Sequence, residues 1–439
     1  MPVSTTTRAT SPEASRMAPL KEPRKTSRRA ARVAAASVLC LAVAAATAAP
    51  AVAAGSGHDG KPQRGALVSA TRVADLDAGQ ATAYVQGVGF TTAPAAQDGV
   101  EVHRLTYRTV DATGRPTVAS GVVALPRNAA GRHPRGLTTV EYTHGTLPYR
   151  GYAASVSDGP DRAVTVMFAG AGFAAVAPDY LGLGVGTGPH PYLDVESETT
   201  AAVDLLAAAR TFAARNGVAL DGRVMATGFS QGGPAALGLG RALQAGALPG
   251  ARLAALAPVS GPYDLRGAEL PAAFDGRLAP PTAVFYLAYA VTAWNRLHHL
   301  YDSPAEAFRA PYADTVEALF DGGHTDEQIV AALPGTPEEL LTPRFIDRLK
   351  HPAGTLARIL RTADSVCTDW TPRAPVRLYS GGLDRDVAVA NTESCRRALA
   401  AHGVDAPVVE TADADHNGSA LASYPAILAW FRGFAATGR

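Results

Sequence analysis

One stretch near the middle of the chain restricts the possible folds more than any other. Residues 222–233 have the pattern of a short apolar strand, a sharp turn and the start of a helix. Within them, Gly228-Phe229-Ser230-Gln231-Gly232 follows G-x-S-x-G, which is typical of a serine held in a strained turn between strand and helix. The outer positions must be small because the two backbones nearly touch there. The stretch predicts an α/β fold with Ser230 at one edge of the sheet, although a glycine-rich turn without catalytic function remains the alternative.

Strand-like and helix-like segments alternate on both sides of this turn. The strand-like segments lie at 137–142, 173–177, 253–259, 376–379 and 408–410. The helix-like segments lie at 163–171, 198–216, 234–243, 389–401 and 424–434. This alternation requires parallel strands with right-handed crossovers, so we expect a mostly parallel central sheet with helices on both faces. A period-two pattern at 100–125, interrupted by a turn at 111–114, adds an antiparallel hairpin.

The alternation breaks between Pro262 and Pro375. That region has helical patterns and no convincing strand. We therefore expect one large core domain formed by 67–261 and 375–439, with a helical cap at 262–374 inserted at the carboxyl edge of the sheet.

The first 54 residues have the composition of an export signal. A basic segment precedes an uncharged, alanine-rich run at 33–49, and small residues follow. This order is typical of a secretory signal peptide. A transmembrane anchor is the less favoured alternative because alanine is weakly apolar. The pair Arg28-Arg29 leaves twin-arginine export open beside the general route. Residues 55–66 are predicted to be a disordered lead-in.

Removal of this segment changes the charge balance. The remaining chain has 32 basic and 37 acidic side chains, a net charge of −5. Nothing in that balance suggests a nucleic-acid partner or an anionic membrane surface. Cys367 and Cys395 are the two cysteines that remain, and an even number in an exported chain favours one disulfide between them.

A serine hydroxyl becomes a nucleophile when a base removes its proton and a carboxylate orients that base. The strand at 376–379 is followed by Asp384 and Asp386, and the strand at 408–410 is followed by His416. Parallel sheets place their sites at these carboxyl ends. We therefore assign His416 as the base and Asp384 as the acid. Asp386 is the competing acid.

Two backbone N–H groups are needed to stabilise a tetrahedral oxyanion. One is expected from Gln231, at the positive end of the helix after Ser230. The other should come from the loop after 137–142, where we favour Thr146 over Gly145. His144 in this loop is predicted to position the loop and to transfer no proton.

No metal site is expected. The run from Asp413 to Gly418 opens like a calcium loop, but its twelfth position is Tyr424 and not glutamate. His298 and His299 are adjacent, and adjacent positions do not share a helix face.

Taken together, these motifs resemble the α/β-hydrolase superfamily over about 120–260 and 375–434. The loop His144-Gly145-Thr146, the segment 178–184, the turn at Ser230 and the segment 259–264 look like the secreted lipase and esterase branch, including the secretory lipase family. The resemblance implies hydrolysis of a small-molecule or lipid ester by Ser230, Asp384 and His416, without a metal or an organic cofactor. It also implies no stable membrane insertion.

The cap is the variable part of such enzymes. Its longest predicted helix carries apolar residues around much of its circumference, among them Phe285, Tyr289 and Trp294. A helix of this kind is buried or lines a pocket. We expect these three residues to contact substrate, against the alternative that they pack the cap onto the core.

The leading interpretation is thus a secreted serine hydrolase of carboxylic esters. A secreted peptidase or an acyltransferase of the same fold would use the same triad, and a binding protein without activity is disfavoured because no triad member is missing. The sequence does not distinguish among substrates or oligomeric states.

Overall fold

The computed structural model describes residues 63–437. The predicted signal peptide at 1–54 and most of the predicted lead-in at 55–66 lie outside these residues.

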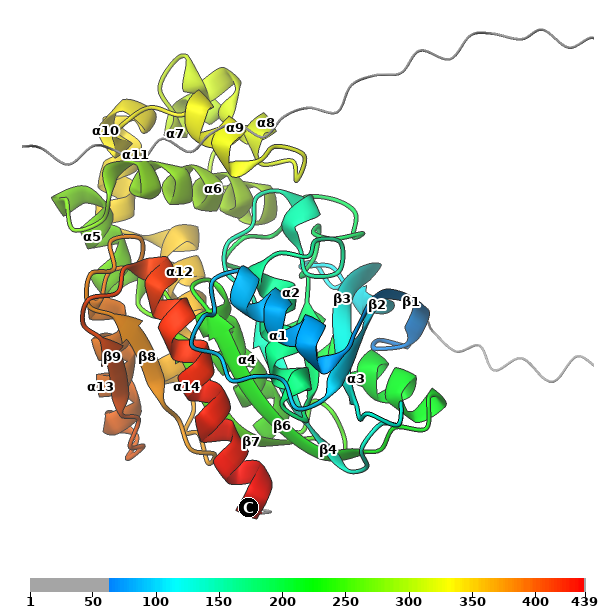
Figure 1. The fold of residues 1–439 in the computed structure, drawn as a ribbon. Coiled ribbons are helices and arrows are strands. Elements are labelled where there is room, and N and C mark those ends of the chain that lie inside the picture. The colour runs from blue at the N-terminus through cyan, green and yellow to red at the C-terminus, as the bar shows by residue number, and fades with distance from the viewer. Residues whose placement is uncertain (1–62, 438–439) are drawn as a thin grey trace, which may run out of the picture. The chain divides into compact units, whose positions relative to one another are not determined.

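A nine-stranded sheet forms the centre of the molecule (Figure 1). Its spatial order is β1-β2-β3-β5-β4-β6-β7-β8-β9. The strands are β1 (Leu67–Leu76), β2 (Gly99–Val110), β3 (Pro116–Arg127), β4 (Leu137–Thr143), β5 (Ala174–Pro178), β6 (Leu220–Phe229), β7 (Arg252–Val259), β8 (Leu378–Gly381) and β9 (Val408–Thr411). From β5 to β9 all neighbours are parallel, whereas β1, β2, β3 and β5 pair antiparallel. The carboxyl ends of the parallel strands therefore meet at one edge.

The predicted hairpin is present as β2 and β3. Its strands pair in one continuous register from Gly99 opposite Arg127 to Val110 opposite Pro116. Side chains alternate between the two faces, because Val122 and Ala124 belong to one core cluster and Val123 and Leu125 to the other.

Helices cover both faces of the sheet. One face packs against α1 (Ala78–Gly87), α2 (Pro160–Gly170) and α14 (His416–Thr437), and the other against α3 (Val195–Arg215), α4 (Gly232–Gln244) and α13 (Ala390–Ala401). Small residues allow this close packing: a Cβ on Gly121 of β3 would lie 2.7 Å from Leu205 Cδ2 of α3. The mostly parallel sheet with helices on both faces, predicted from the sequence, is confirmed.

Between β7 and β8 the chain forms helices and no strand. They are a π-helix η2 (Leu265–Glu269), α5 (Leu270–Asp275), α6 (Pro280–His298), α7 (Pro304–Ala307), η3 (Tyr312–Asp314), α8 (Val316–Leu319), α9 (Asp326–Ala332), α10 (Pro337–Leu340), α11 (Pro343–Lys350) and α12 (Gly354–Thr368). A further short turn, η1 (Arg150–Tyr152), follows β4. In Figure 1, α6 to α11 gather beyond the carboxyl ends of the strands, at the top of the view.

This helical insertion has its own apolar cluster, which α6 supplies most heavily. Helix α12 joins it to the core, since Leu360 belongs to the insertion's cluster and Val366 to that of the sheet. The division into a core (67–261 and 375–439) and a cap (262–374) stays a prediction. No helix in residues 63–437 is long and apolar enough to cross a membrane.

Candidate active site

Ser230 occupies the turn between β6 and α4. Its φ of 54° is left-handed, which is uncommon for a residue other than glycine. The turn is held by two hydrogen bonds: the Ser230 N–H donates to the Val259 carbonyl at 2.9 Å, and the Ser230 carbonyl accepts from the Gly233 N–H at 2.8 Å. The strained residue is thereby fixed to β7 and to the first turn of α4, and its side chain lines a cavity.

The glycines beside Ser230 are required by space. A Cβ on Gly228 would lie 2.1 Å from the Gly232 carbonyl oxygen, and a Cβ on Gly232 would lie 2.0 Å from the Thr143 carbonyl oxygen. Real Cβ atoms do not approach backbone this closely. Gly228 and Gly232 therefore permit the close approach of strand and helix that the pentapeptide predicts.

His416 and Asp384 meet at the same edge. His416 begins α14 and Asp384 lies in the turn after β8. The His416 Nδ1 atom is 2.7 Å from Asp384 Oδ2, and both side chains are buried. Asp384 Oδ1 accepts from the N–H groups of Asp386 and Val387, at 3.0 and 2.9 Å. Because an ionised carboxylate only accepts, His416 Nδ1 carries the hydrogen and Nε2 is left as a proton acceptor.

The competing acid points elsewhere. Asp386 Oδ1 accepts from the hydroxyl of Thr282, at 3.2 Å, at the amino end of α6. Of the two carboxylates, only Asp384 forms an ion pair with His416 within the part of the chain that the structure describes.

Ser230 and His416 line one cavity of about 590 Å³. The His416 Nε2 atom is buried and has no hydrogen-bond partner within residues 63–437. A Ser230–His416 hydrogen bond is thus not formed in this state, and such bonds are often long in enzymes without substrate. Both side chains nevertheless line the same cavity.

Of the two expected oxyanion donors, Gln231 follows Ser230 in the chain and Thr146 lines the same cavity as Ser230. Gln231 precedes α4, and its N–H, like that of Thr146, donates to no other residue in 63–437. The loop after β4 lies against the Ser230 turn at Gly145, since a Cβ on Gly145 would lie 3.4 Å from Ser230 Cβ. His144 is fully buried, with Nδ1 2.7 Å from the Gly145 carbonyl and Nε2 3.2 Å from the Asp179 carbonyl. His144 therefore contacts the backbone of its own loop and of the segment after β5.

The sequence interpretation missed two buried side chains that contact the side chain of Gln231. Gln231 Nε2 lies 2.7 Å from Glu198 Oε1 and 2.8 Å from His190 Nε2, while His190 Nδ1 lies 3.0 Å from the Leu181 carbonyl. A carbonyl only accepts, so His190 Nδ1 carries the hydrogen and both amide hydrogens of Gln231 are used. Burial lowers the pKa of His190 to about 3 and raises that of Glu198 to about 8. A signal existed, since Glu198 lies on the apolar face of its helix.

A second missed carboxylate supports the loop that carries Asp384. Glu269 Oε2 accepts from the N–H of Ala388 at 2.9 Å and from Asn391 Nδ2 at 2.6 Å. Burial raises the pKa of Glu269 to about 7. Glu269 ends the π-helix after β7, far from Asp384 in sequence, so no local pattern indicates this contact.

The three predicted substrate contacts in α6 lie in different surroundings. Phe285 lines a smaller cavity of about 210 Å³ that shares four residues with the larger one. Tyr289 is buried and stacks on Tyr192 and Phe320, with ring centroids 4.2 and 4.5 Å apart. Trp294 is 2% exposed and belongs to the apolar cluster of the insertion. Phe285 thus lies beside the candidate active site, and the Tyr289 hydroxyl donates to the carbonyl of Leu147, which lines the larger cavity, at 3.3 Å. The neighbouring Tyr286 lines both cavities, although it was not singled out from the sequence.

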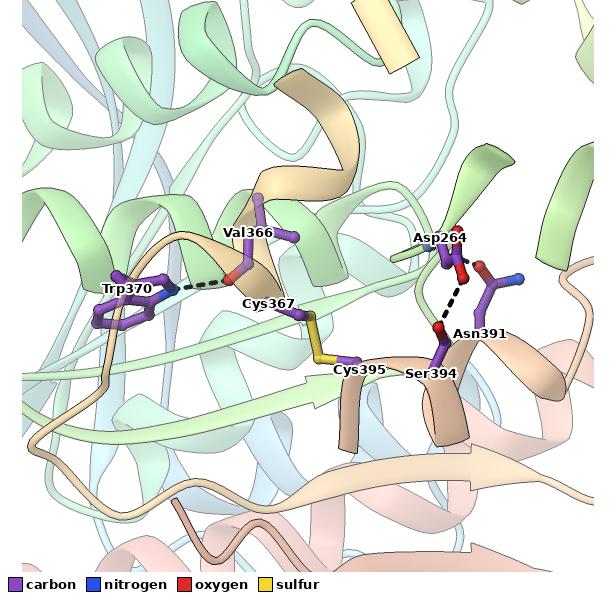
Figure 2. The surroundings of a disulfide bond; sticks show 7 residues. All are labelled: Asp264, Val366, Cys367, Trp370, Asn391, Ser394 and Cys395. Atoms are coloured by element: carbon purple, nitrogen blue, oxygen red, sulfur yellow. Dashed lines mark hydrogen bonds between the residues drawn. A yellow bond between two sulfur atoms is a disulfide. The ribbon is translucent and has the colours of Figure 1, made fainter. Parts of the chain in front are cut away.

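Cys367 and Cys395 form a disulfide, as the cysteine count predicted (Figure 2). It joins α12 to α13, the helix that follows Asp384. Nearby, Ser394 Oγ donates to Asp264 Oδ2 at 2.6 Å and the Asp264 N–H donates to Asn391 Oδ1 at 2.9 Å. The start of α13 is thus tied both to the insertion and to the segment after β7.

Within residues 63–437, no group of three or more histidine, cysteine, aspartate or glutamate side chains could hold a metal ion. His299 pairs with Asp302 at 2.8 Å, and Asp415 Oδ1 accepts from the Gly418 N–H at 2.7 Å. These contacts are local and need no metal.

Solved structures resemble the chain closely. A mutant of the rice cell wall degrading esterase LipA from Xanthomonas oryzae is 25% identical, with a TM-score of 0.74 over 86% of this chain and 100% of that one. A protein from Legionella pneumophila described as a proposed hydrolase is also 25% identical, with a TM-score of 0.74 over 84% and 98% of the two chains.

Candida antarctica lipase A in its closed state is 16% identical, with a TM-score of 0.59 over 81% of this chain and 78% of that one, and this likeness concerns the fold. No protein-family model and no curated protein sequence matches the chain. The likeness thus rests on structures in which the α/β-hydrolase fold carries esterases and lipases.

Proposed function

We propose that this chain, an α/β-hydrolase of the lipase and esterase family, hydrolyses carboxylic esters through an acyl-enzyme on Ser230. The chain is a carboxylic ester hydrolase, and our proposal concerns which residues carry out the reaction. The observation that supports the assignment most is the buried His416–Asp384 pair at 2.7 Å, because His416 lines the same cavity as Ser230 and its Nε2 atom has no hydrogen-bond partner within residues 63–437.

In the proposed reaction, Ser230 Oγ attacks the ester carbonyl carbon while its proton passes to His416 Nε2. Asp384 holds the hydrogen on Nδ1 and stabilises the imidazolium. The negative oxygen of the tetrahedral intermediate accepts from the N–H groups of Gln231 and Thr146. The intermediate collapses when the C–O bond breaks and His416 returns the proton to the leaving alcohol.

Water then repeats the sequence on the acyl-enzyme. It loses a proton to His416 Nε2 as its oxygen bonds to the carbonyl carbon, and the carboxylic acid leaves as Ser230 recovers its proton. Glu198 and His190 hold the Gln231 side chain, so we assign them as positioning residues for the oxyanion donor.

The test is Ser230→Ala. We expect kcat/KM for a chromogenic ester to fall on the order of 10⁴-fold or more, because no other group can form the acyl-enzyme. Ser155→Ala is the matched control, since Ser155 is fully buried and does not line the cavity. A Ser230→Ala variant that keeps a tenth of the activity with an unchanged melting temperature contradicts the assignment.

Export belongs to the same proposal. The basic and apolar composition of residues 1–54 supports a cleaved signal peptide, and the Cys367–Cys395 disulfide suits an oxidising compartment. We therefore expect the protein to be secreted, and we assign 262–374 as its cap. Mass spectrometry of the protein from culture medium should give an N-terminus close to residue 55. A protein in the medium that still begins at Met1 would contradict cleavage.

A further inference from the structure

The walls of the cavity at Ser230 come mainly from the core of the molecule. Of the residues that line it, only Tyr286 and Asp326 belong to the insertion between β7 and β8. The remainder come from the segment after α1, the end of β4 and the loop after it, η1, α2, the end of β6, the turns that carry Ser230 and Asp386, and α14. The shape of the cavity is therefore set more by α2, α14 and the segment after α1 than by the cap.

One end of the cavity is mostly apolar, lined by Val164 of α2, Leu421 of α14, and Val88 and Phe90 after α1. Asp161, one turn before Val164 on α2, also lines the cavity, and its Oδ1 accepts from the Tyr142 hydroxyl at 2.6 Å. These elements are in contact, because a Cβ on Gly89 would lie 3.3 Å from Leu421 Cδ2.

The first residue of α14 is His416, and the helix rises about 1.5 Å per residue, so Leu421 lies roughly 8 Å along the axis from His416. An apolar substrate chain that starts at Ser230 would therefore pass His416 and then contact apolar side chains such as Leu421.

The end of the cavity that adjoins the smaller cavity is acidic. Asp326 and Asp386 line both the large cavity and the smaller one beside it, together with Thr146 and Tyr286. Within residues 63–437, no lysine or arginine lines either cavity. A carboxylate or phosphate at this end would therefore meet two like charges without a counter-charge, and like charges in a partly desolvated site repel.

We propose that the cavity selects amphiphilic esters, with an apolar chain held between α2, α14 and Val88–Phe90 and an uncharged or cationic polar group beside Asp326 and Asp386. Esters with an anionic group at the acidic end are excluded. Ser230 and His416 line the same cavity, so the ester bond of such a substrate must lie within reach of both. This inference rests on the proposed function.

The apolar end is tested with Leu421→Trp and Leu421→Ala. Activity is measured on two ester series, one with a fixed alcohol and acyl chains from acetate to palmitate, the other with a fixed acyl group and alkyl alcohols of increasing length. The tryptophan should lower kcat/KM for the longest chain of one series about tenfold relative to its shortest member, and the alanine should shift the preference toward longer chains. The series that responds identifies which side of the ester occupies this end.

Ala429→Trp is the control, because Ala429 is exposed on the same helix and lines neither cavity. If neither Leu421 variant changes either series beyond this control, the apolar end is not a substrate site. That result differs from failure of the proposed function, in which the wild-type protein hydrolyses no ester and a phosphonate does not label Ser230.

The acidic end is tested with pairs of esters of equal size, one neutral and one carrying a carboxylate, placed first on the acyl side and then on the alcohol side. Wild-type protein should disfavour the anion on the side opposite the apolar chain. Asp326→Asn should reduce the ratio of kcat/KM for the neutral ester to kcat/KM for the anionic ester about threefold to tenfold, a change expected for one partly exposed charge. Glu327→Gln is the control, because Glu327 is the neighbouring residue and lines neither cavity, and it should leave this ratio unchanged. Equal rates for both members of each pair, or equal effects of the two variants, overturn the proposal.

Discussion

The sheet edge at Ser230 and the helical segment above it hold their side chains by different means. At the edge, backbone contacts fix each group: Gly228 and Gly232 let strand and helix touch, and Asp384 accepts from two N–H groups while it pairs with His416. In the helical segment, aromatic rings pack on one another, as Tyr289 does between Tyr192 and Phe320. Catalysis at the sheet edge should therefore depend on single atoms, whereas the stability of the helical segment should depend on the volume of its buried side chains.

The largest difference should appear when one atom is changed at the edge. Asp384→Asn should lower kcat on the order of 10⁴-fold, because an amide no longer holds the hydrogen on His416 Nδ1 or stabilises the imidazolium. Asp386→Asn should cost far less, since its side chain contacts Thr282 and not His416. Steady-state kinetics on a chromogenic ester measures both variants. The reverse ranking would make Asp386 the acid.

A change of volume in α6 should act on stability. Trp294→Ala should lower the free energy of unfolding by about 3–5 kcal/mol, because the ring is 2% exposed and its removal leaves a cavity. The ratio of kcat/KM for long and short acyl esters should stay as in the wild type. Denaturant unfolding measures the loss of stability, and the series of acyl esters measures the ratio of kcat/KM. A changed ratio without loss of stability would place Trp294 in the substrate site.

A third, more gradual effect concerns the buried carboxyl of Glu198, which contacts the Gln231 side chain. Its folded pKa is raised to about 8 from the ordinary 4.5, so the folded protein retains a proton that the unfolded chain releases. The stability of the wild type should then fall as pH rises from 4.5 to 8, by up to about 1.4 kcal/mol per pH unit. Glu198→Gln keeps the acceptor for Gln231 and removes the charge, so this fall should disappear.

Denaturant midpoints of wild type and Glu198→Gln across this pH range test the prediction. Glu196→Gln is the matched control, because Glu196 is exposed on the same helix. The two glutamine variants should behave alike at pH 4 and diverge as pH rises. Parallel curves would mean that Glu198 is not buried as a neutral group.

The same contrast explains how far the sequence could be interpreted. Ser230, Asp384 and His416 follow strands that their own local patterns predict, and parallel strands bring such turns to one edge. The orientation of α6 has no comparable local signal, because its apolar residues cover much of the circumference. Which ring faces substrate is decided by neighbours such as Phe320, distant in the chain.

Buried polar contacts were the other part that the sequence could not supply. Glu269 contacts Asn391 across 122 positions, and nothing near either residue indicates the pairing. Glu198 was visible as a carboxylate on an apolar helix face, but its partner Gln231 was assigned only a backbone role. Such contacts depend on the packed tertiary structure.

Labelling with a serine-directed phosphonate tests the central claim most directly. The account predicts one equivalent of label per chain, located by peptide mapping on Ser230, with much slower labelling of Asp384→Asn and labelling of Trp294→Ala at the wild-type rate wherever that variant is folded. Stoichiometric label on another residue, or an active wild-type enzyme that takes up no label, would contradict the account.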